Sequence, residues 1–311
     1  MDSVSHTNSG NENTFYSIEK ALQTPDKVQK LDLHFKELTE LPEEIFNFNN
    51  LRELILWNNQ LTELPDEISN LKNLEKLEAS GNKITRLPDS IGDLDNLKVL
   101  IVSWNELTEL PENIGNLKNL ESLGLNNNKL KELPESIGNL SNLKEFILRE
   151  NRLLELPDTI GNLQNLAKLR ASGNHLSALP ENICNLENLQ KLEVQENGLK
   201  SIPENIGKLS KLEKIRLYKN MLSTLPDSIC DLENLQKLIL YENELIKLPE
   251  NIGNLRALEE LEVSGNDLAH LPESISQLTH LKYLDISKNE FSRQDVNRYR
   301  EMLPNTKIIW D

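Results

Sequence analysis

The chain has 311 residues, 27% of them charged, and a formal net charge of −16 at pH 7. This acidity argues against nucleic acid and an anionic membrane as partners, because both would repel the surface as a whole. No apolar stretch in the sequence is long enough to span a membrane.

Two short segments precede the main pattern of the sequence. Residues 1–13 are polar and rich in Ser and Asn, which predicts a disordered tail that is not a Sec signal peptide. Residues 14–27 are predicted to form an N-terminal helical cap, in which Phe15, Ile18 and Leu22 are spaced like one face of a helix.

Residues 28–291 consist of twelve units of 23 residues, of which the first begins at Val28 and the last, truncated unit at Leu281. A constant period of this length indicates a solenoid, in which each unit contacts only its neighbours. Positions one, four and six of each unit are apolar and alternate with polar residues. This alternation predicts a short strand, and twelve parallel strands would form one long sheet.

Two other positions of the unit are nearly invariant within the array. Position nine is Asn in eleven units, at the point where the chain leaves the strand. Because Asn donates and accepts at once, a buried column of Asn can satisfy backbone groups from turn to turn. Position fifteen is Pro in eleven units, and an acidic residue follows each Pro. Pro fixes φ and the carboxylate can face unpaired amides, so this pair favours the start of a short helical turn.

The arrangement LxxLxLxxNxLxxLPxxIxxLxN resembles the leucine-rich repeat family, and its 23-residue length with a Leu-Pro pair resembles the intracellular Ras-group and bacterial members. The resemblance implies an α/β solenoid shaped as a horseshoe. Its parallel β-sheet would line the concave face, with short helical or 3-10 turns on the convex side and a cap at each end. The first unit departs from the pattern, since Lys36 replaces Asn.

Residues 292–311 are similar to the C-terminal caps of bacterial members of that family. Ser292 and Asp295 have the spacing of a capping box. Residues predicted to seal the last unit are the helix face of Val296, Tyr299 and Leu303 and the apolar run Ile308, Ile309 and Trp310.

The two cysteines, Cys184 and Cys230, stand where most other units have Gly, and we interpret them as small fillers. Units two apart would hold them at least about 9 Å from each other, too far for a disulfide. Extracellular solenoids of this kind usually carry cysteine-bridged caps, so their absence favours a cytoplasmic location. Export by a route without a Sec signal peptide is the alternative.

Position seven should project from the concave face, and it alternates two large side chains with two smaller ones. Gly81, Gly173 and Gly265 follow the same period of four units. We therefore expect shallow bays floored by Gly and Ser, about 19 Å apart, which is four strand spacings. Down the array, position seven reads His34, Trp57, Ser80, Ser103, Asn126, Arg149, Ser172, Gln195, Tyr218, Tyr241, Ser264 and Ser287.

The sequence offers no catalytic, metal or cofactor site. Its five histidines occupy unrelated positions without metal-ligand spacing, and its glycines form neither a P-loop nor a strand-linked GxGxxG. Carboxylates are so frequent that chance pairs carry no weight without a pocket. We therefore predict that the protein is not an enzyme.

Two groups of concave side chains are the candidate partner-binding residues. The first is apolar, and exposed Trp beside β-branched residues is the composition of an interface core; the alternative is that these side chains only cover one another. It comprises Ile55, Trp57, Val99, Ile101, Trp104 and Ile147.

The second group is a basic column in which Lys occupies position three of four successive units, 166 to 257. If unpaired, it would attract an acidic segment of a partner. The alternative is that the interleaved Glu193 and Glu145 neutralise it. The candidate residues are Arg149, Arg170 and Arg216, with Tyr218 and Tyr241 alongside.

These observations predict a monomeric, non-catalytic scaffold that holds a protein partner in its concavity, with a role in signalling. The first alternative is a secreted bacterial effector of the same fold that uses the same face on a host protein. The second is an enzyme or enzyme subunit. The sequence does not identify the partner.

Overall fold

The structure is a computed structural model that describes residues 13–310. Residues 1–12 of the predicted tail lie outside the described residues. Asn13, which the sequence assigns to that tail, belongs to the ordered array, because its carbonyl accepts hydrogen bonds from the Gln29 and Lys30 amides, both at 3.1 Å.

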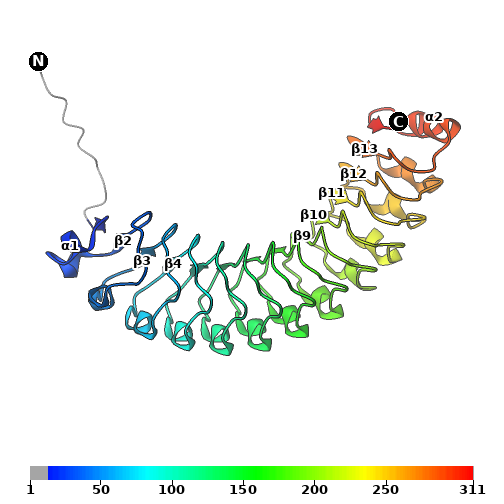
Figure 1. Ribbon diagram of the computed structural model, residues 1–311. Coiled ribbons are helices and arrows are strands. Elements are labelled where there is room, and N and C mark those ends of the chain that lie inside the picture. The colour runs from blue at the N-terminus through cyan, green and yellow to red at the C-terminus, as the bar shows by residue number, and fades with distance from the viewer. Residues whose placement is uncertain (1–12, 311) are drawn as a thin grey trace, which may run out of the picture.

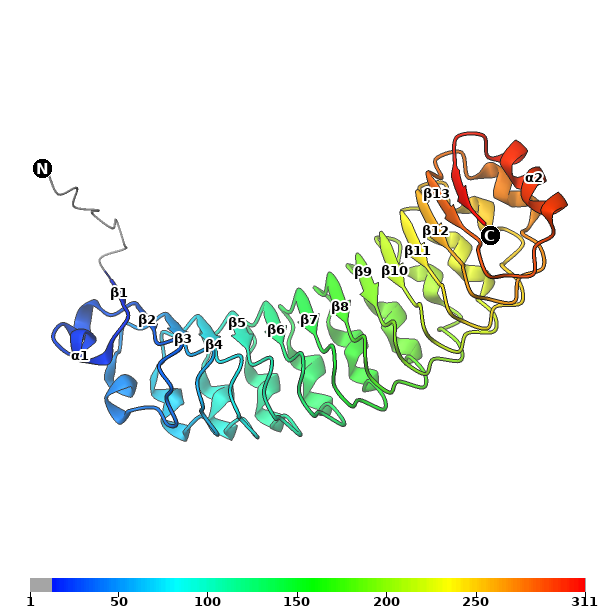
Figure 2. The same ribbon diagram turned by 45° about the horizontal axis from the view of Figure 1, so that its top comes forward.

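The described chain forms a curved solenoid whose strands make one 14-stranded parallel sheet in sequence order (Figures 1 and 2). Neighbouring units pair in register, so that Glu53 of one strand lies opposite Lys76 of the next. The fold class predicted from the repeat is confirmed. The strands are β1 Thr14–Phe15, β2 Lys30–Asp32, β3 Glu53–Ile55, β4 Lys76–Glu78, β5 Val99–Ile101, β6 Ser122–Gly124, β7 Glu145–Ile147, β8 Lys168–Arg170, β9 Lys191–Glu193, β10 Lys214–Arg216, β11 Lys237–Ile239, β12 Glu260–Glu262, β13 Tyr283–Asp285 and β14 Lys307–Ile309.

Short 3-10 helices form the convex side, opposite the sheet (Figure 1). Most begin directly after the Pro of position fifteen, whose φ lies near −65° and which acts as the N-cap. The predicted helical turn is therefore confirmed. These helices span Pro25–Lys27, Glu43–Asn47, Asp66–Asn70, Asp89–Asp93, Glu112–Asn116, Glu135–Asn139, Asp158–Asn162, Glu181–Asn185, Ile206–Lys208, Asp227–Asp231, Ile252–Asn254 and Glu273–Gln277.

The Asn column has the predicted structural role. Asn82 is 8% exposed, and its Oδ1 accepts from the Leu61 amide of the preceding unit at 3.0 Å. Its Nδ2 donates to the carbonyls of Leu56 and Ala79, both at 3.0 Å. Each Asn therefore ties its own strand end to the unit before it. In the first unit, which lacks this Asn, the Lys36 amide donates to Oδ1 of the next Asn at 2.9 Å.

The N-terminal cap differs from the single helix predicted from its apolar spacing. Phe15 belongs to β1, which pairs with β2, and helix α1 spans only Ile18–Ala21. Phe15 and Ile18 pack against the core, but Leu22 is 44% exposed. The unpaired backbone of the first repeat strand explains the difference, because an added strand satisfies that edge and a helix would not.

The C-terminal cap contains helix α2, Arg293–Met302, and strand β14, which pairs with β13. The predicted capping box is present: the Asp295 amide donates to Ser292 Oγ at 3.1 Å, and the Ser292 amide donates to Asp295 Oδ2 at 3.0 Å. The predicted helix face is buried, and the Tyr299 hydroxyl accepts from the Leu271 amide at 2.7 Å. Helix and strand together cover the last repeat.

Position eight of every unit has a positive φ, which sequence analysis did not predict. Its residues include Gly81 at φ 67° but also Trp104 at φ 56°. Left-handed backbone here turns the chain away from the strand, and Gly adopts it without steric cost. Side chains at position eight therefore lie beyond the end of the strand and not on the sheet.

Candidate partner-binding face

Side chains at positions three, five and seven line the concave surface as predicted, but their exposure varies. Ile55 is only 4% exposed. It lies opposite Asp32 and Glu78 in the flanking strands, whose side chains cover it. The prediction of Ile55 as an exposed contact is therefore wrong. For this residue the alternative holds, in which the concave side chains only cover one another. Val99, Ile101 and Ile147 remain partly exposed.

Trp57 belongs to an aromatic cluster at the N-terminal end of the face. Its ring stacks on His34 with centroids 4.6 Å apart and an interplanar angle of 1°. Phe35 packs edge-on against Trp57 at 4.7 Å and is 62% exposed. Sequence analysis missed Phe35 although it included Trp104, which occupies the same position eight of its unit. An aromatic residue directly after a large position-seven residue was the available signal.

Trp104 is 65% exposed, and as a position-eight residue it lies beyond the strand instead of beside Ile101. Between Trp104 and Trp57 lies a hollow of about 520 Å³, where the Gly–Ser floor predicts a bay. We call this hollow the aromatic bay. Its lining consists of Trp57, Asn58, Glu78, Ser80, Gly81, Asn82 and Trp104.

The three arginines of the basic column are paired, so for them the alternative holds in which the interleaved glutamates pair with the column. All three converge on Glu193, which is 4% exposed. Arg170 Nε lies 3.3 Å and Arg216 Nη1 lies 3.7 Å from its oxygens, and Arg149 also pairs with it. The in-register stacking of β8, β9 and β10 places Glu193 between Arg170 and Arg216. A buried carboxylate requires such partners, so these arginines stabilise the fold.

Some of the lysines of the column are paired as well. Glu145 lies 3.8 Å from Lys168 Nζ and also accepts from Arg170, while Lys237 pairs with Glu260. Within residues 13–310, Lys191 and Lys214 form no ion pair within 4.0 Å. Burial, followed by repulsion from Arg216, lowers the pKa of Lys214. Three carboxylates, those of Glu145, Glu193 and Glu260, thus offset part of the positive charge that could attract an acidic segment.

Tyr218 and Tyr241 form a second stacked pair, with centroids 4.3 Å apart and an interplanar angle of 11°. Burial, together with the neighbouring Tyr218, raises the pKa of Tyr241. Beyond them, burial and the adjacent Glu260 carboxyl raise the pKa of Glu262 to about 7. This end of the face therefore combines aromatic rings with a carboxyl that titrates near neutral pH.

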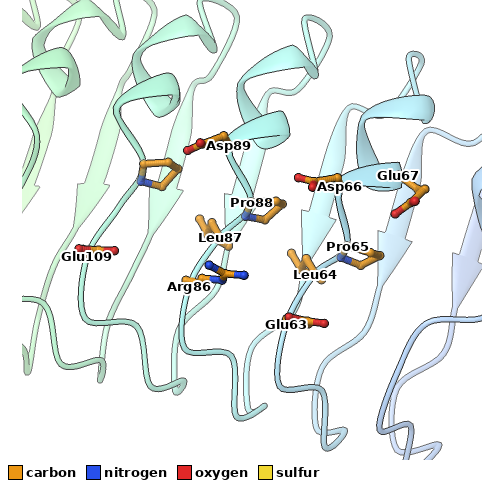
Figure 3. Close-up of a pocket in the computed structure, with 11 residues that line it drawn as sticks. Glu63, Leu64, Pro65, Asp66, Glu67, Arg86, Leu87, Pro88, Asp89 and Glu109 are labelled. Carbon is orange, nitrogen blue, oxygen red and sulfur yellow. The ribbon is translucent and has the colours of Figure 1, made fainter.

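A further hollow, of about 660 Å³, lies away from the concave face, beside the starts of two 3-10 helices. Figure 3 shows the carboxylates of Glu63, Asp66 and Asp89 around it, with the Arg86 side chain among them. A similar hollow recurs further along the array, at Glu109 to Pro157. Because the hollow follows from the Leu-Pro-acidic pattern, we interpret it as a property of the repeat.

The described residues contain no group of three or more His, Cys, Asp or Glu that could hold a metal ion. Over the same residues, no helix is both long and apolar enough to cross a membrane. Cys184 and Cys230 are free and buried, as expected of fillers, and burial raises the pKa of each thiol to about 11.

Three features place this chain among the α/β solenoids. Its parallel sheet is open, 3-10 helices back the sheet, and a column of Asn side chains ties neighbouring units together. The model of the leucine-rich repeat region matches residues 27–126, 102–174 and 121–195, and a second leucine-rich repeat model matches residues 187–245. The chain belongs to the leucine-rich repeat family. No curated protein matches it.

Solved structures support this family assignment. A leucine-rich repeat protein of Leptospira interrogans is 31% identical, with a TM-score of 0.68, over 96% of this chain and 100% of that one. The plant peptide hormone receptor RGFR1, in complex with RGF2, is also 31% identical, with a TM-score of 0.79, over 92% of this chain but 47% of the receptor. An internalin of Listeria monocytogenes, at 22% identity and a TM-score of 0.82 over 91% of this chain and 80% of that one, resembles it in fold.

Proposed function

We propose that this protein is a non-catalytic scaffold that binds a partner protein on its concave face. The observation that carries the proposal is the aromatic surface around Trp57 and Trp104. Side chains on this face and along its edge need not be large or apolar to maintain the fold, yet Trp104 and Phe35, at the edge beyond the strand ends, are 65% and 62% exposed. Exposed Trp is enriched among the residues that dominate protein interfaces.

The plant receptor described above supports the proposal, since that peptide hormone receptor, 31% identical to this chain, was solved in complex with RGF2. The lack of a P-loop and of metal-ligand spacing in the sequence supports the non-catalytic part of the proposal. Nucleophile and base pairs, phosphate-binding loops and metal-ligand groups are the features that an enzyme would need. A role in signalling follows if the partner is itself regulated by binding.

Site-specific photo-crosslinking tests the proposal. A photoreactive amino acid would replace Trp104 or Ser122 on the concave side and, in matched controls, Glu135 or Asp158 on the convex side. We expect one discrete crosslinked partner from both concave positions, and the purified partner should bind the unmodified protein. A partner that crosslinks from the convex positions alone would contradict the proposal.

A further inference from the structure

The aromatic bay leaves one face of Trp57 uncovered. Parallel strands lie about 4.8 Å apart, so planar side chains at position seven of adjacent units can stack, as His34 and Trp57 do at 4.6 Å. The next unit has Ser80 at this position, which is too short to continue the stack. The ring face of Trp57 that points away from His34 therefore borders the bay.

The floor of the bay is backbone. Gly81 has φ 67° and no side chain, and Asn58 Oδ1 lies 2.2 Å from where a Cβ on Gly81 would be. At the equivalent position four units further on, which we call the second bay by analogy, Glu150 occupies this place instead, with Oε1 2.4 Å from a Cβ on Gly173. A carboxylate lies across that second floor, whereas a neutral amide lies across the first.

Glu78 is the single charged residue that lines the aromatic bay. Its Oε2 lies 2.9 Å from Lys76 Nζ, and Oε1 has no partner among residues 13–310. The Asn82 side chain also lines the bay, but its amide is engaged with backbone groups. A ligand would therefore meet an indole face, a second indole and a carboxylate.

Such a lining favours a cation, because two indoles border the bay and Oε1 of Glu78 can still accept a hydrogen bond while Oε2 pairs with Lys76. A cation near an indole face is attracted by the ring quadrupole, most strongly for Trp, and a carboxylate adds a charge-assisted hydrogen bond. A guanidinium is planar, stacks on aromatic rings and hydrogen-bonds to a carboxylate. It could occupy the stacking place that Ser80 leaves empty, with the same spacing that His34 uses on the opposite face.

We propose that the aromatic bay binds an arginine side chain of the partner protein. The inference rests on the proposed concave-face function and concerns the N-terminal end of the face, away from the basic column, whose arginines pair with Glu193. It makes the partner basic where it contacts the N-terminal third of the array.

The test uses a small probe and needs no identified partner. The chain has three tryptophans, Trp57, Trp104 and Trp310, so the indole N–H signals of nitrogen-15-labelled protein can be assigned from single Trp→Phe variants. N-acetyl-arginine N-methylamide would be titrated, with the citrulline analogue as a neutral control of nearly the same shape. We expect saturable shifts of the Trp57 and Trp104 signals, an unchanged Trp310 signal, and about tenfold weaker binding of citrulline.

Three variants define the site. Glu78→Gln should weaken arginine binding about tenfold, because it removes the charge and keeps the shape. Ser80→Tyr should abolish binding by continuing the stack into the bay. The matched control Glu150→Gln, in the second bay, should bind arginine like the unmodified protein. Circular dichroism would verify that each variant is folded.

Equal binding of arginine and citrulline, unchanged binding by Glu78→Gln, or the absence of saturable shifts would each overturn the inference. Failure here is distinguishable from failure of the proposed function. A partner that crosslinks on the concave face but tolerates Glu78→Gln and Ser80→Tyr would leave the scaffold proposal intact and remove this one. A convex partner would remove the scaffold proposal even if the bay binds free arginine.

Discussion

Replacing Asn128 with Leu tests the contribution of the Asn column in the middle of the array. Asn128 is 7% exposed, and its Oδ1 accepts from the Leu107 amide at 3.0 Å. Its Nδ2 donates to the carbonyls of Val102 and Leu125, both at 3.0 Å. A Leu side chain can replace none of these bonds.

The expected loss of stability in Asn128→Leu depends on which backbone groups lose their last hydrogen-bond partner. The Val102 carbonyl keeps a bond from Asn105 and the Leu125 carbonyl keeps one from Asn151. The Leu107 amide has Asn128 as its acceptor and is left unpaired. One orphaned buried donor costs about 1–3 kcal/mol, so we expect a loss of about 2 kcal/mol in the free energy of unfolding.

Urea denaturation measures the loss of stability of the whole protein, and hydrogen exchange measures the protection of the Leu107 amide. The control is Asn142→Leu, because Asn142 is exposed and water can replace its bond to the Lys118 carbonyl. The control should lose less than about 0.5 kcal/mol. In Asn128→Leu, the Leu107 amide should also exchange faster. Equal urea midpoints for the two variants, with Leu107 still protected, would refute the role of the column.

Three further predictions concern the caps, the convex side and pH. Deleting residues 292–311 should expose the β13 edge and promote association, whereas a monodisperse monomer in light scattering would contradict this. Gly138→Ala should lower the free energy of unfolding in urea by about 1–3 kcal/mol, because a Cβ would lie 2.4 Å from the Thr159 carbonyl oxygen. The control Cys184→Ala should lower it less, and equal losses in the two variants would contradict this reasoning. Because the folded pKa of Glu262 is about 7 against 4.5, its stabilising contribution is full below pH 4.5 and is lost as pH rises through 7. Glu262→Gln should therefore flatten stability between these pH values, and an unchanged pH profile would disprove the assignment.

The strands, the Asn column and the C-terminal capping box were predictable because each depends on contacts that recur at a fixed spacing. The pairing of the concave charges was harder to predict. Sequence places Glu193 among basic residues but does not say whether side chains reach it. The structure shows that the Arg149 side chain reaches across two units to pair with Glu193. Which basic side chains reach this carboxylate depends on their burial and their rotamers.

Two stretches of identical sequence form 3-10 helices of different length, which the local sequence alone cannot explain. Residues 111–116 and 249–254 both read PENIGN, yet the first gives the 3-10 helix Glu112–Asn116 and the second only Ile252–Asn254. The preceding unit has Gly92 in the first case and Cys230 in the second. A Cβ on Gly92 would lie 2.3 Å from the Asn113 carbonyl oxygen, so this close approach is open to Gly and not to Cys.

The same shortening follows the other cysteine, since Ile206–Lys208 comes one unit after Cys184. Ser69 and Phe46 occupy the equivalent position and are followed by the full-length helices Asp89–Asp93 and Asp66–Asn70, so a side chain at this position does not by itself shorten the next helix. The convex packing is therefore set between units. A reading of one unit at a time cannot predict it.

The most direct test of the central claim is the affinity of the purified partner for concave and convex variants, measured by surface plasmon resonance. Truncating Trp57 or Trp104 to Ala should weaken binding by about 2 kcal/mol, mainly through faster dissociation. Charge reversal at the convex Glu135 or Asp158 should leave binding unchanged. If the convex variants abolish binding while both Trp variants bind normally, the concave face is not the partner-binding surface.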